Sequence, residues 1–261
     1  GVTHYFGVPQ MAEAMMADPG FADADLSRLH AIFLGGAPLS QQLIAAYLDK
    51  GVALINGYGM SEAGTVMHVP VNATAVRGHP GSVGLPAPLI ETRLVGANGA
   101  EVATGITGEV WLRGPSVTPG YWHSPQETAA AFSDGWFKTG DLGVREEDGY
   151  FRIVDRLKDM YVTGGENVYP AEVEAALLVH PNVKDVAVIG VPDTRWGETG
   201  LAFVVPVGAF DPEALSAHCA SRLARFKCPA SFEPITTIPR TASGKIMKHL
   251  LRERAAGRAA K

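Results

Sequence analysis

The chain has 261 residues, of which 46% are apolar and 19% are charged, a balance typical of a soluble globular protein with a substantial core. Its net charge of -5 argues against nucleic-acid binding through bulk electrostatics, and no apolar run approaches the ~18 residues of a membrane span. Cys219 and Cys228 imply no disulfide framework, so we expect reduced thiols and a cytoplasmic location. The start at Gly1, without Met, indicates a fragment or a processed chain.

The first predicted unit is a strand, a helix and a second strand. Ala31–Leu34 is an apolar run that stops at Gly35-Gly36, and Ser40 is placed to cap a helix reaching about Lys50. The second strand, from Val52, is expected to end at Asn56-Gly57-Tyr58-Gly59. A unit of this length predicts parallel strands, so both glycine turns should lie at the edge where open α/β sheets bind ligands.

Short strands and turns follow, which predict a β-rich subdomain. Glu109–Arg113 and Tyr150–Val154 suit strands, with Asp148-Gly149 as a hairpin turn. One helix interrupts them at Ser124–Glu127, where we predict an N-cap, a proline at the first helical position and a capping-box glutamate.

After residue 156 helices and strands alternate, which predicts a separate α+β domain. The expected elements are a helix over Pro170–Val179, strands Val186–Val191 and Leu201–Val205, a helix from Asp211-Pro212 and a last helix capped by Ser243. The predicted fold class is therefore α/β: the end of a large α/β domain with a β-rich subdomain, followed by a small α+β carboxyl-terminal domain. We place the large domain at residues 1–157, as α/β 1–75 and β-rich 76–157, and the small mobile domain at 158–261.

Five segments carry side chains suited to chemistry. In Tyr58–Glu62 the ring can stack on a base, Ser61 can donate to a phosphate and Glu62 can hold Mg²⁺, although alone a capped strand-to-helix turn explains this segment better. Thr139-Gly140-Asp141 puts a carboxylate at a glycine turn, where it can accept ribose hydroxyls or simply form a surface turn.

The remaining three segments lie in or before the second domain. Asp155–Asp159 is either a solvated linker or a hinge with Arg156 directed at a nucleotide. Thr163–Asn167 is a glycine loop that either admits a ligand or forms a tight turn. Pro239–Lys245 places Lys245 near the start of the last helix, as an ordinary exposed lysine or as a cation for a transferring phosphate.

The order of these segments is more informative than any one of them. With Gly35–Pro38 at the start, they resemble the later motifs of the acyl-CoA synthetase, adenylation-domain and luciferase superfamily, and Gly164–Pro170 looks most like fatty acyl-CoA ligases. The resemblance runs through essentially the whole chain. It implies an enzyme that activates a carboxylic acid with ATP as acyl-adenylate and transfers it to coenzyme A.

The resemblance also implies a role for each matching position. Catalytic roles fall to Lys245, Ser61 and Glu62, with Glu62 holding Mg²⁺ and Lys158 at the hinge. The nucleotide and coenzyme A positions that it implies are Gly36, Ala37, Pro38, Asn56, Gly57, Tyr58, Gly59, Met60, Ser61, Asp141, Arg156, Lys245, Gly164, Gly165 and Glu166. Among these, Tyr58 stacks on adenine, Asp141 and Arg156 bind the ribose, and Gly164–Glu166 face the pantetheine channel.

One departure from the family is the missing Ser/Thr/Gly-rich phosphate loop, so we predict that this chain alone does not form acyl-adenylate. The acid is expected to be a fatty or other monocarboxylic acid, because no basic residue near Phe6–Pro9 or Gly57–Gly59 suggests a second carboxylate. Three alternatives stay open: an adenylation enzyme that loads a carrier protein, luciferase-type oxidation, and a non-catalytic AMP-binding fragment. Assembly into a homo-oligomer is also left open.

Overall fold

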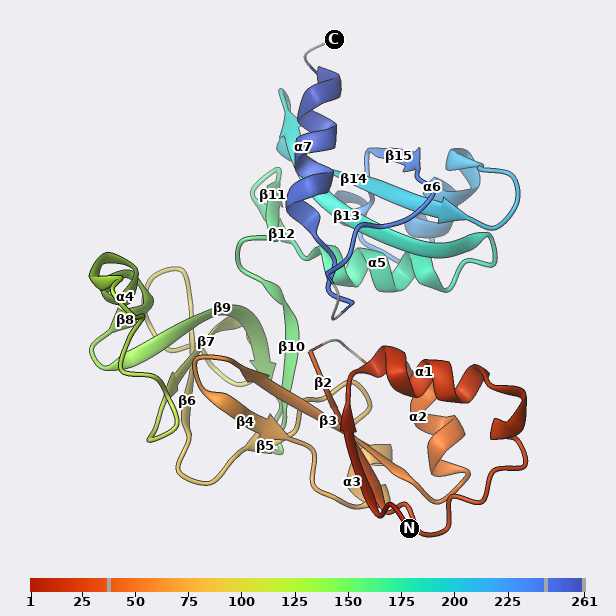
Figure 1. The fold of residues 1–261 in the computed structure, drawn as a ribbon. Coiled ribbons are helices and arrows are strands. Elements are labelled where there is room, and N and C mark those ends of the chain that lie inside the picture. Colours follow the sequence, from red (N-terminus) through yellow and green to blue (C-terminus); the bar gives the residue numbers. More distant parts are fainter. Residues whose placement is uncertain (37–38, 242–243, 260–261) are drawn as a thin grey trace. The chain divides into compact units, whose positions relative to one another are not determined.

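The computed structural model in Figure 1 describes residues 1–36, 39–241 and 244–259. The chain forms two compact units, residues 1–153 and 154–261. Its fold is α/β, as predicted, with three five-stranded sheets. The units divide slightly before the predicted domain boundary at residue 157, and the assignment of the two functional domains stays a prediction.

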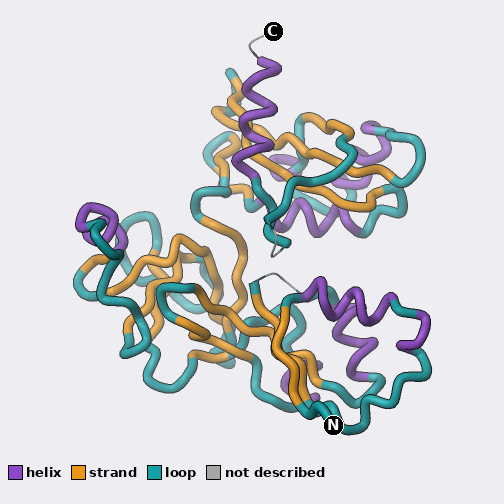
Figure 2. Tube along the Cα trace, in the orientation of Figure 1, coloured by secondary structure: helices purple, strands orange, loops and turns teal. Residues whose placement is uncertain are grey.

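The first sheet has the strand order β1-β2-β3-β4-β5. Strands β1 to β3 are parallel, whereas β4 and β5 run antiparallel to their neighbours. The elements of this part are β1 (His4–Gly7), α1 (Pro9–Ala17), the 3₁₀ turn η1 (Pro19–Phe21), β2 (Ala31–Gly35), α2 (Gln41–Leu48), β3 (Ala53–Met60), β4 (Gly64–His68), α3 (Ala73–Gly78) and β5 (Leu85–Pro86). Figure 2 shows α1 and α2 together on one side of this sheet.

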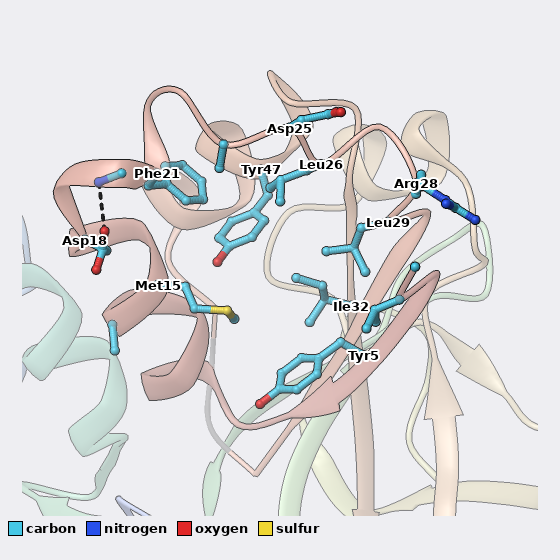
Figure 3. Close-up of a pocket in the computed structure, with 15 residues that line it drawn as sticks. Tyr5, Met15, Asp18, Phe21, Asp25, Leu26, Arg28, Leu29, Ile32 and Tyr47 are labelled. Carbon is cyan, nitrogen blue, oxygen red and sulfur yellow. Dashed lines mark hydrogen bonds between the residues drawn. The ribbon is translucent and has the colours of Figure 1, made fainter.

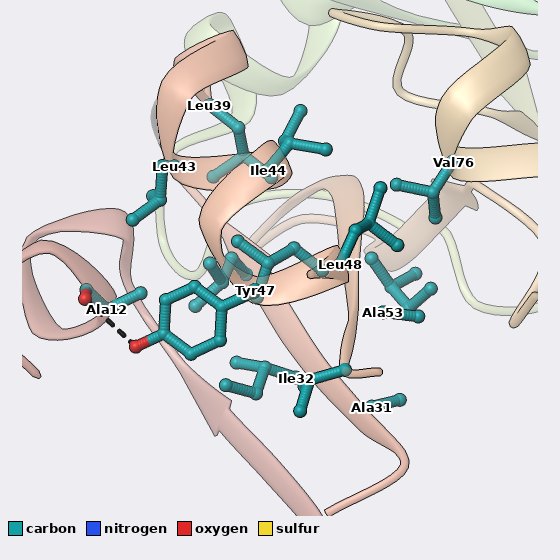
Figure 4. Packing of buried hydrophobic residues seen from close by; sticks show 14 of the residues in the cluster. Ala12, Ala31, Ile32, Leu39, Leu43, Ile44, Tyr47, Leu48, Ala53 and Val76 are labelled. Atoms are coloured by element: carbon teal, nitrogen blue, oxygen red, sulfur yellow. Dashed lines mark hydrogen bonds between the residues drawn. The ribbon is translucent and has the colours of Figure 1, made fainter. Parts of the chain in front are cut away.

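Helix α2 forms as its sequence predicts. The Ser40 hydroxyl accepts a hydrogen bond from the Leu43 N–H at 3.2 Å, which satisfies one of the free donors of the first turn. Leu43, Tyr47 and their neighbours are buried against β2 and β3. The Tyr47 hydroxyl donates to the Ala12 carbonyl at 3.0 Å, so α1 and α2 are joined inside this core (Figure 4).

The second strand differs from the prediction at its end. It does not stop at Asn56–Gly59 but continues to Met60 and returns as β4, so the expected strand-to-helix turn is a β-hairpin. The pairing register shifts between Tyr58 and Gly59, and Gly64 closes the hairpin with a φ of 66°. Sequence reasoning missed this because glycines usually end strands, whereas here they permit two strands to approach closely.

The second sheet has the order β10-β9-β7-β6, with β8 paired to β9. Its elements are β6 (Glu91–Val95), β7 (Gly108–Arg113), α4 (Pro125–Ala131), β8 (Phe132–Ser133), β9 (Trp136–Arg145) and β10 (Phe151–Arg156). Gly149, with a φ of 88°, turns the chain between β9 and β10 as predicted. The capping box predicted at α4 is wrong: Ser124 precedes the helix, but its side chain makes no capping hydrogen bond, and Thr128 donates to the Ser124 carbonyl instead.

The second unit contains the third sheet, in the order β12-β11-β14-β13 with β15 paired to β14. Its elements are β11 (Tyr161–Thr163), β12 (Glu166–Val168), α5 (Pro170–Leu178), β13 (Val183–Asp193), β14 (Gly197–Pro206), α6 (Pro212–Ala220), the 3₁₀ turn η2 (Arg225–Lys227), β15 (Ser231–Pro234) and α7 (Lys248–Ala259). Helix α6 starts at Asp211-Pro212 as predicted, and Asp211 caps it by accepting from the Ala214 N–H at 3.0 Å. The predicted cap Ser243 lies outside the described residues.

Both cysteines are free thiols, as expected. Burial raises the pKa of Cys219 to about 11 and also raises that of Cys228. Among the described residues, no helix combines the length and the apolar character that crossing a bilayer requires.

Candidate functional site

The predicted edge of the first sheet is formed by glycines of β2 and β3. Gly35 pairs with Gly57 in the parallel register, and a Cβ atom at Gly35 would lie 3.1 Å from the Gly57 carbonyl oxygen. Gly36 follows with a φ of 88°, which favours glycine. Ala37 and Pro38, which were also predicted to line the adenine, lie outside the described residues.

The β3–β4 hairpin carries the predicted phosphate and metal residues at its tip. A Cβ atom at Gly59 would overlap the Gly64 carbonyl oxygen and lie 2.8 Å from Thr65 Cα, so this close approach requires glycine. Ser61 is exposed at the tip, and Glu62 is half-buried. The backbone carbonyl of Glu62 accepts from the Thr118 N–H at 2.7 Å, which anchors the tip to the segment after β7.

A cavity of about 520 Å³ lies against these strands. Its lining comes from β1 to β4 and from the residue after β2: Phe6, Gly7, Phe33, Leu34, Gly35, Gly36, Ile55, Gly57, Tyr58, Gly59, Met60, Gly64, Thr65 and His68. Phe6 and Phe33 stack with their ring centroids 4.6 Å apart. Five predicted site residues therefore line one cavity: Gly36, Gly57, Tyr58, Gly59 and Met60.

A larger cavity of about 830 Å³ lies on the opposite face of the sheet (Figure 3). Tyr5 and Ile32 line it, whereas Phe6 and Phe33 line the smaller cavity, and successive residues of a strand point to opposite faces. This larger cavity contains none of the residues predicted for the site, so we assign the candidate site to the smaller one.

Tyr58 and Asp141 meet inside the first unit although 83 positions separate them. The Tyr58 hydroxyl donates to Asp141 Oδ2 at 2.7 Å, and both residues are buried. The structure thus brings together the residue predicted to stack on a base and the residue predicted to bind a ribose. A buried carboxylate accepts hydrogen bonds at two oxygens, which suits a ligand that offers hydroxyl groups.

Asp141 lies on a bulge of β9, not at the surface turn that was weighed for it. Glu109 pairs with Leu142 and Trp111 pairs with Lys138, so three residues of β9, Thr139–Asp141, face the single Val110. Gly140 has a φ of 70°, which this bulge requires. Bulges of this kind redirect a side chain, and here the redirected side chain is the Asp141 carboxylate.

Two residues at this bulge were missed from the sequence. Glu109 Oε1 accepts from the Gly140 N–H at 3.0 Å, and Glu109 Oε2 accepts from Trp111 Nε1 at 2.8 Å. The available signal was a polar residue two positions before a tryptophan in a predicted strand, which places both on one face of the sheet. Without the pairing register, nothing connected that face to Asp141.

The Glu62 carboxylate has one described protein donor. The Tyr121 hydroxyl donates to Glu62 Oε1 at 3.0 Å, and burial together with this bond raises the pKa of Tyr121. Mg²⁺ is bound by proteins through one or two carboxylates plus phosphate and water oxygens. The carboxylate oxygens of half-buried Glu62, beside the exposed hydroxyl of Ser61, are metal ligands of the required kind.

In the second unit the predicted Gly164–Glu166 loop is a tight hairpin between β11 and β12. Gly164 and Gly165 have φ values of 59° and 90°, as a two-residue turn demands. The Gly164 N–H donates to the Trp196 carbonyl at 2.9 Å, and a Cβ atom at Gly164 would lie 3.1 Å from the Trp196 ring. Trp196, with 46% of its surface exposed, is a further aromatic group beside this loop that the sequence did not single out.

Lys245 lies on a loop held by Arg240. The Arg240 guanidinium donates to both oxygens of Asp185, at 2.8 and 3.0 Å, and to the Gly244 carbonyl at 2.9 Å. The Lys245 N–H donates to the Thr241 hydroxyl at 3.1 Å. Lys245 therefore precedes α7, which begins at Lys248, and does not lie within the helix.

The other predicted residues are placed as follows. Asn56 is buried, and its Nδ2 donates to the Ser82 carbonyl at 2.8 Å, which holds it inside the first unit. Arg156, Gly164–Glu166 and Lys245 belong to the second unit. Their convergence with Tyr58 and Asp141 on one ligand stays a prediction, as do the roles of all the site residues.

Comparison with known families identifies the class to which this fold and site belong. The model of the AMP-binding enzyme family matches residues 1–122, and that of the AMP-binding enzyme C-terminal domain matches residues 172–245. The chain belongs to the AMP-binding enzymes, the adenylate-forming superfamily that its motifs resemble.

Individual relatives are acyl-activating enzymes. The chain is 47% identical over 255 residues to a feruloyl-CoA synthase of Amycolatopsis sp, covering 97% of this chain and 52% of the relative. It is 40% identical to a long-chain-fatty-acid–CoA ligase of Bacillus subtilis (strain 168), covering 96% of this chain and 45% of the relative. The chain thus spans about half the length of the curated relatives it matches.

Solved structures give the same class. The amide bond synthetase McbA from Marinactinospora thermotolerans matches with a TM-score of 0.87 at 36% identity, covering 97% of this chain and 53% of that chain. The o-succinylbenzoate CoA synthetase MenE from Bacillus subtilis, in complex with the acyl-adenylate OSB-AMP, matches with a TM-score of 0.87 at 31% identity, covering 96% and 51%.

Proposed function

We propose that this chain is the carboxyl-terminal part of an acid–CoA ligase, which activates a carboxylic acid with ATP and transfers it to coenzyme A. The observation that carries the proposal is the buried contact between Tyr58 and Asp141, with Tyr58 also lining an apolar cavity. In this assignment the cavity accepts the acyl group, the Tyr58 ring stacks on the base and Asp141 accepts the ribose hydroxyls. Relatives named as CoA ligases support the same reaction class.

The character of the cavity favours an acid with an apolar body. Among the described lining residues there is no Asp, Glu, Lys or Arg, so a second charged group on the substrate would meet no permanently charged partner there, His68 being the one lining imidazole. Gly64, where a Cβ atom would meet open space, leaves room along one wall, and the stacked Phe6 and Phe33 offer an aromatic surface. We therefore propose a monocarboxylic acid, with an aromatic acid favoured by these rings and a fatty acid as the second candidate.

In this proposal Glu62 and Ser61 of the first unit and Lys245 of the second interact with the charged phosphates of the nucleotide. Glu62 would supply an oxygen ligand to Mg²⁺, and the ion would neutralise phosphate charge when bound. Ser61 would donate to the α-phosphate, and the Lys245 ammonium would stabilise charge that develops there during adenylation. Gly164, Gly165 and the exposed Trp196 would then border the pantetheine arm of coenzyme A.

The decisive experiment compares nucleotide binding and turnover in one set of samples. Calorimetry with AMP should show binding to this chain that Asp141→Asn weakens, whereas exposed Asp134→Asn should leave it unchanged. Pyrophosphate release should be absent with this chain alone and present when it is joined to an upstream half of a matching relative. Wild-type levels of AMP binding in Asp141→Asn would refute the assignment.

Substrate and acceptor are decided separately, with the joined protein. Ferulate, a set of fatty acids of graded length and a dicarboxylic acid are compared by pyrophosphate release, and the dicarboxylic acid is expected to be the poorest. Thioester formation with coenzyme A is then compared with loading of a phosphopantetheinylated carrier protein. Preference for the carrier would replace the coenzyme A assignment.

A further inference from the structure

We propose that Glu109 is a positioning residue, which holds the Thr139–Asp141 bulge so that the Asp141 carboxylate meets the Tyr58 hydroxyl. The inference deepens the proposed function and rests on it for the identity of the ligand that Asp141 binds. The positioning itself rests on hydrogen bonds within the first unit.

The bulge gives Gly140 an N–H that the strand ladder does not use. With Glu109 paired to Leu142 and Trp111 paired to Lys138, the residues between lack partners of the regular register. The Gly140 N–H donates instead to Glu109 Oε1 at 3.0 Å. A half-buried N–H needs an acceptor, so the carboxylate takes the place of the missing ladder carbonyl.

A carboxylate is required here because the position faces two donors. Glu109 Oε2 accepts from the indole N–H of Trp111 at 2.8 Å, while Oε1 accepts from Gly140. An ionised carboxylate only accepts, so both oxygens can serve both donors at once. A glutamine of the same shape would turn its NH₂ group toward one of them and lose that bond.

The bulge is fixed at its other end by Thr139. The Thr139 hydroxyl donates to the Val110 carbonyl at 2.7 Å and accepts from the Asp141 N–H at 3.0 Å. Glu109 and Thr139 therefore secure the backbone on both sides of the Gly140–Asp141 peptide. Because Gly140 has no side chain of its own to anchor it, release of its N–H lets the neighbouring Asp141 carboxylate shift away from Tyr58.

The test measures how strongly the chain distinguishes AMP from 2′,3′-dideoxy-AMP, which lacks the hydroxyls assigned to Asp141. Glu109→Gln should weaken AMP binding roughly ten-fold, as expected for one charge-assisted hydrogen bond, and leave dideoxy-AMP binding unchanged. Asp141→Asn should erase the same preference, and the double variant should lose no more than Asp141→Asn alone. The matched control Glu91→Gln, on the neighbouring strand β6, should keep wild-type preference.

Thr139→Val, which frees the other end of the bulge, is the second variant and should show the same loss if Glu109→Gln does not fold. Full preference for AMP in a folded Glu109→Gln protein would overturn the inference while leaving the proposed function intact. If the wild-type chain shows no preference between the two nucleotides, the proposed function fails. Amide exchange then decides the positioning role: Glu109→Ala, which removes both acceptor oxygens, should speed exchange at Gly140 but not at Gly143, and unchanged exchange at Gly140 would overturn it.

Discussion

Removing the Lys248 ammonium should destabilise the second unit, because the buried Glu174 carboxylate then loses its cationic partner. Lys248 Nζ lies 2.8 Å from Glu174 Oε1, and the two side chains are only 10% and 14% exposed. The same Glu174 oxygen accepts from the Val188 N–H at 2.8 Å, so the pair joins α5, β13 and the start of α7. We take Lys248→Met, which keeps the length of the stem, as the perturbation.

The expected loss in the free energy of unfolding depends on the protonation state that Glu174 adopts without Lys248. A buried carboxylate without its cation either stays charged or binds a proton, and protonation at pH 7 of a group with an ordinary pKa costs about 4 kcal/mol. Loss of one partner of a buried pair is typically worth about 3 to 5 kcal/mol, so the two estimates agree. We expect a loss of about 3 to 4 kcal/mol in the free energy of unfolding of this unit.

The pH dependence provides a second signature. Burial raises the pKa of Glu174 above its usual value, so the folded protein holds this proton more tightly than the unfolded chain. Its contribution to stability is then complete below the ordinary carboxyl range and is lost as the pH rises through the raised pKa. Without Lys248 the pKa of Glu174 rises further, so the deficit of Lys248→Met should shrink on acidification only between the folded-state pKa of the variant and that of the wild type, with a limiting slope of about 1.4 kcal/mol per pH unit.

The assay is hydrogen exchange read by mass spectrometry on peptides of α5, β13 and α7, with peptides of the first unit as an internal reference. The matched control is Lys227→Met, because Lys227 pairs with Glu172 on the same helix but with 23% and 40% exposure. That variant should lose less than about 1 kcal/mol. The reasoning would be refuted if both variants lost the same free energy of unfolding, or if the loss in Lys248→Met did not change with pH.

Two further predictions test the hairpin and the thiols. Gly59→Ala should distort the β3–β4 hairpin and lower the free energy of unfolding by roughly 2 kcal/mol, because the added Cβ would overlap the Gly64 carbonyl. The control Gly78→Ala, whose Cβ would meet open space, should change the free energy of unfolding, measured by thermal unfolding, by less than about 0.5 kcal/mol. Cys219, with a pKa of about 11 and a buried sulfur, should resist alkylation by iodoacetamide at pH 8, so Cys228 should be alkylated first. Mass spectrometry of samples taken over time would show the order, and faster labelling of Cys219 would contradict its burial.

The sequence predicted the local elements well wherever a single physical rule decides. Ser40 and Asp211 each stand directly before a helix, and the side-chain oxygen of each accepts a hydrogen bond from a free backbone N–H of the first turn. The parallel pairing of β2 and β3 followed from the length of their crossover. The capping box at Ser124 did not form, and the observed side-chain bond at this end of the helix is from the Thr128 hydroxyl to the Ser124 carbonyl.

The site was predicted as residues but not as geometry. That Tyr58 and Asp141 share a hydrogen bond depends on a strand that continues past two glycines and on a bulge in another sheet. Glycine permits both a turn and a close approach, and sequence alone does not separate these uses. The pairing of Glu109 with Gly140 was out of reach for the same reason, since it exists only in a shifted register.

Each unit fixes its own functional loop by contacts that lie entirely inside that unit. In the first, Glu109 and Thr139 hold the bulge that carries Asp141. In the second, Arg240 ties the loop of Lys245 to Asp185, and the buried Lys248 secures the helix that follows. Each named contact joins residues of the same unit, so the Asp141 bulge and the Lys245 loop can each be perturbed without changing a named contact of the other.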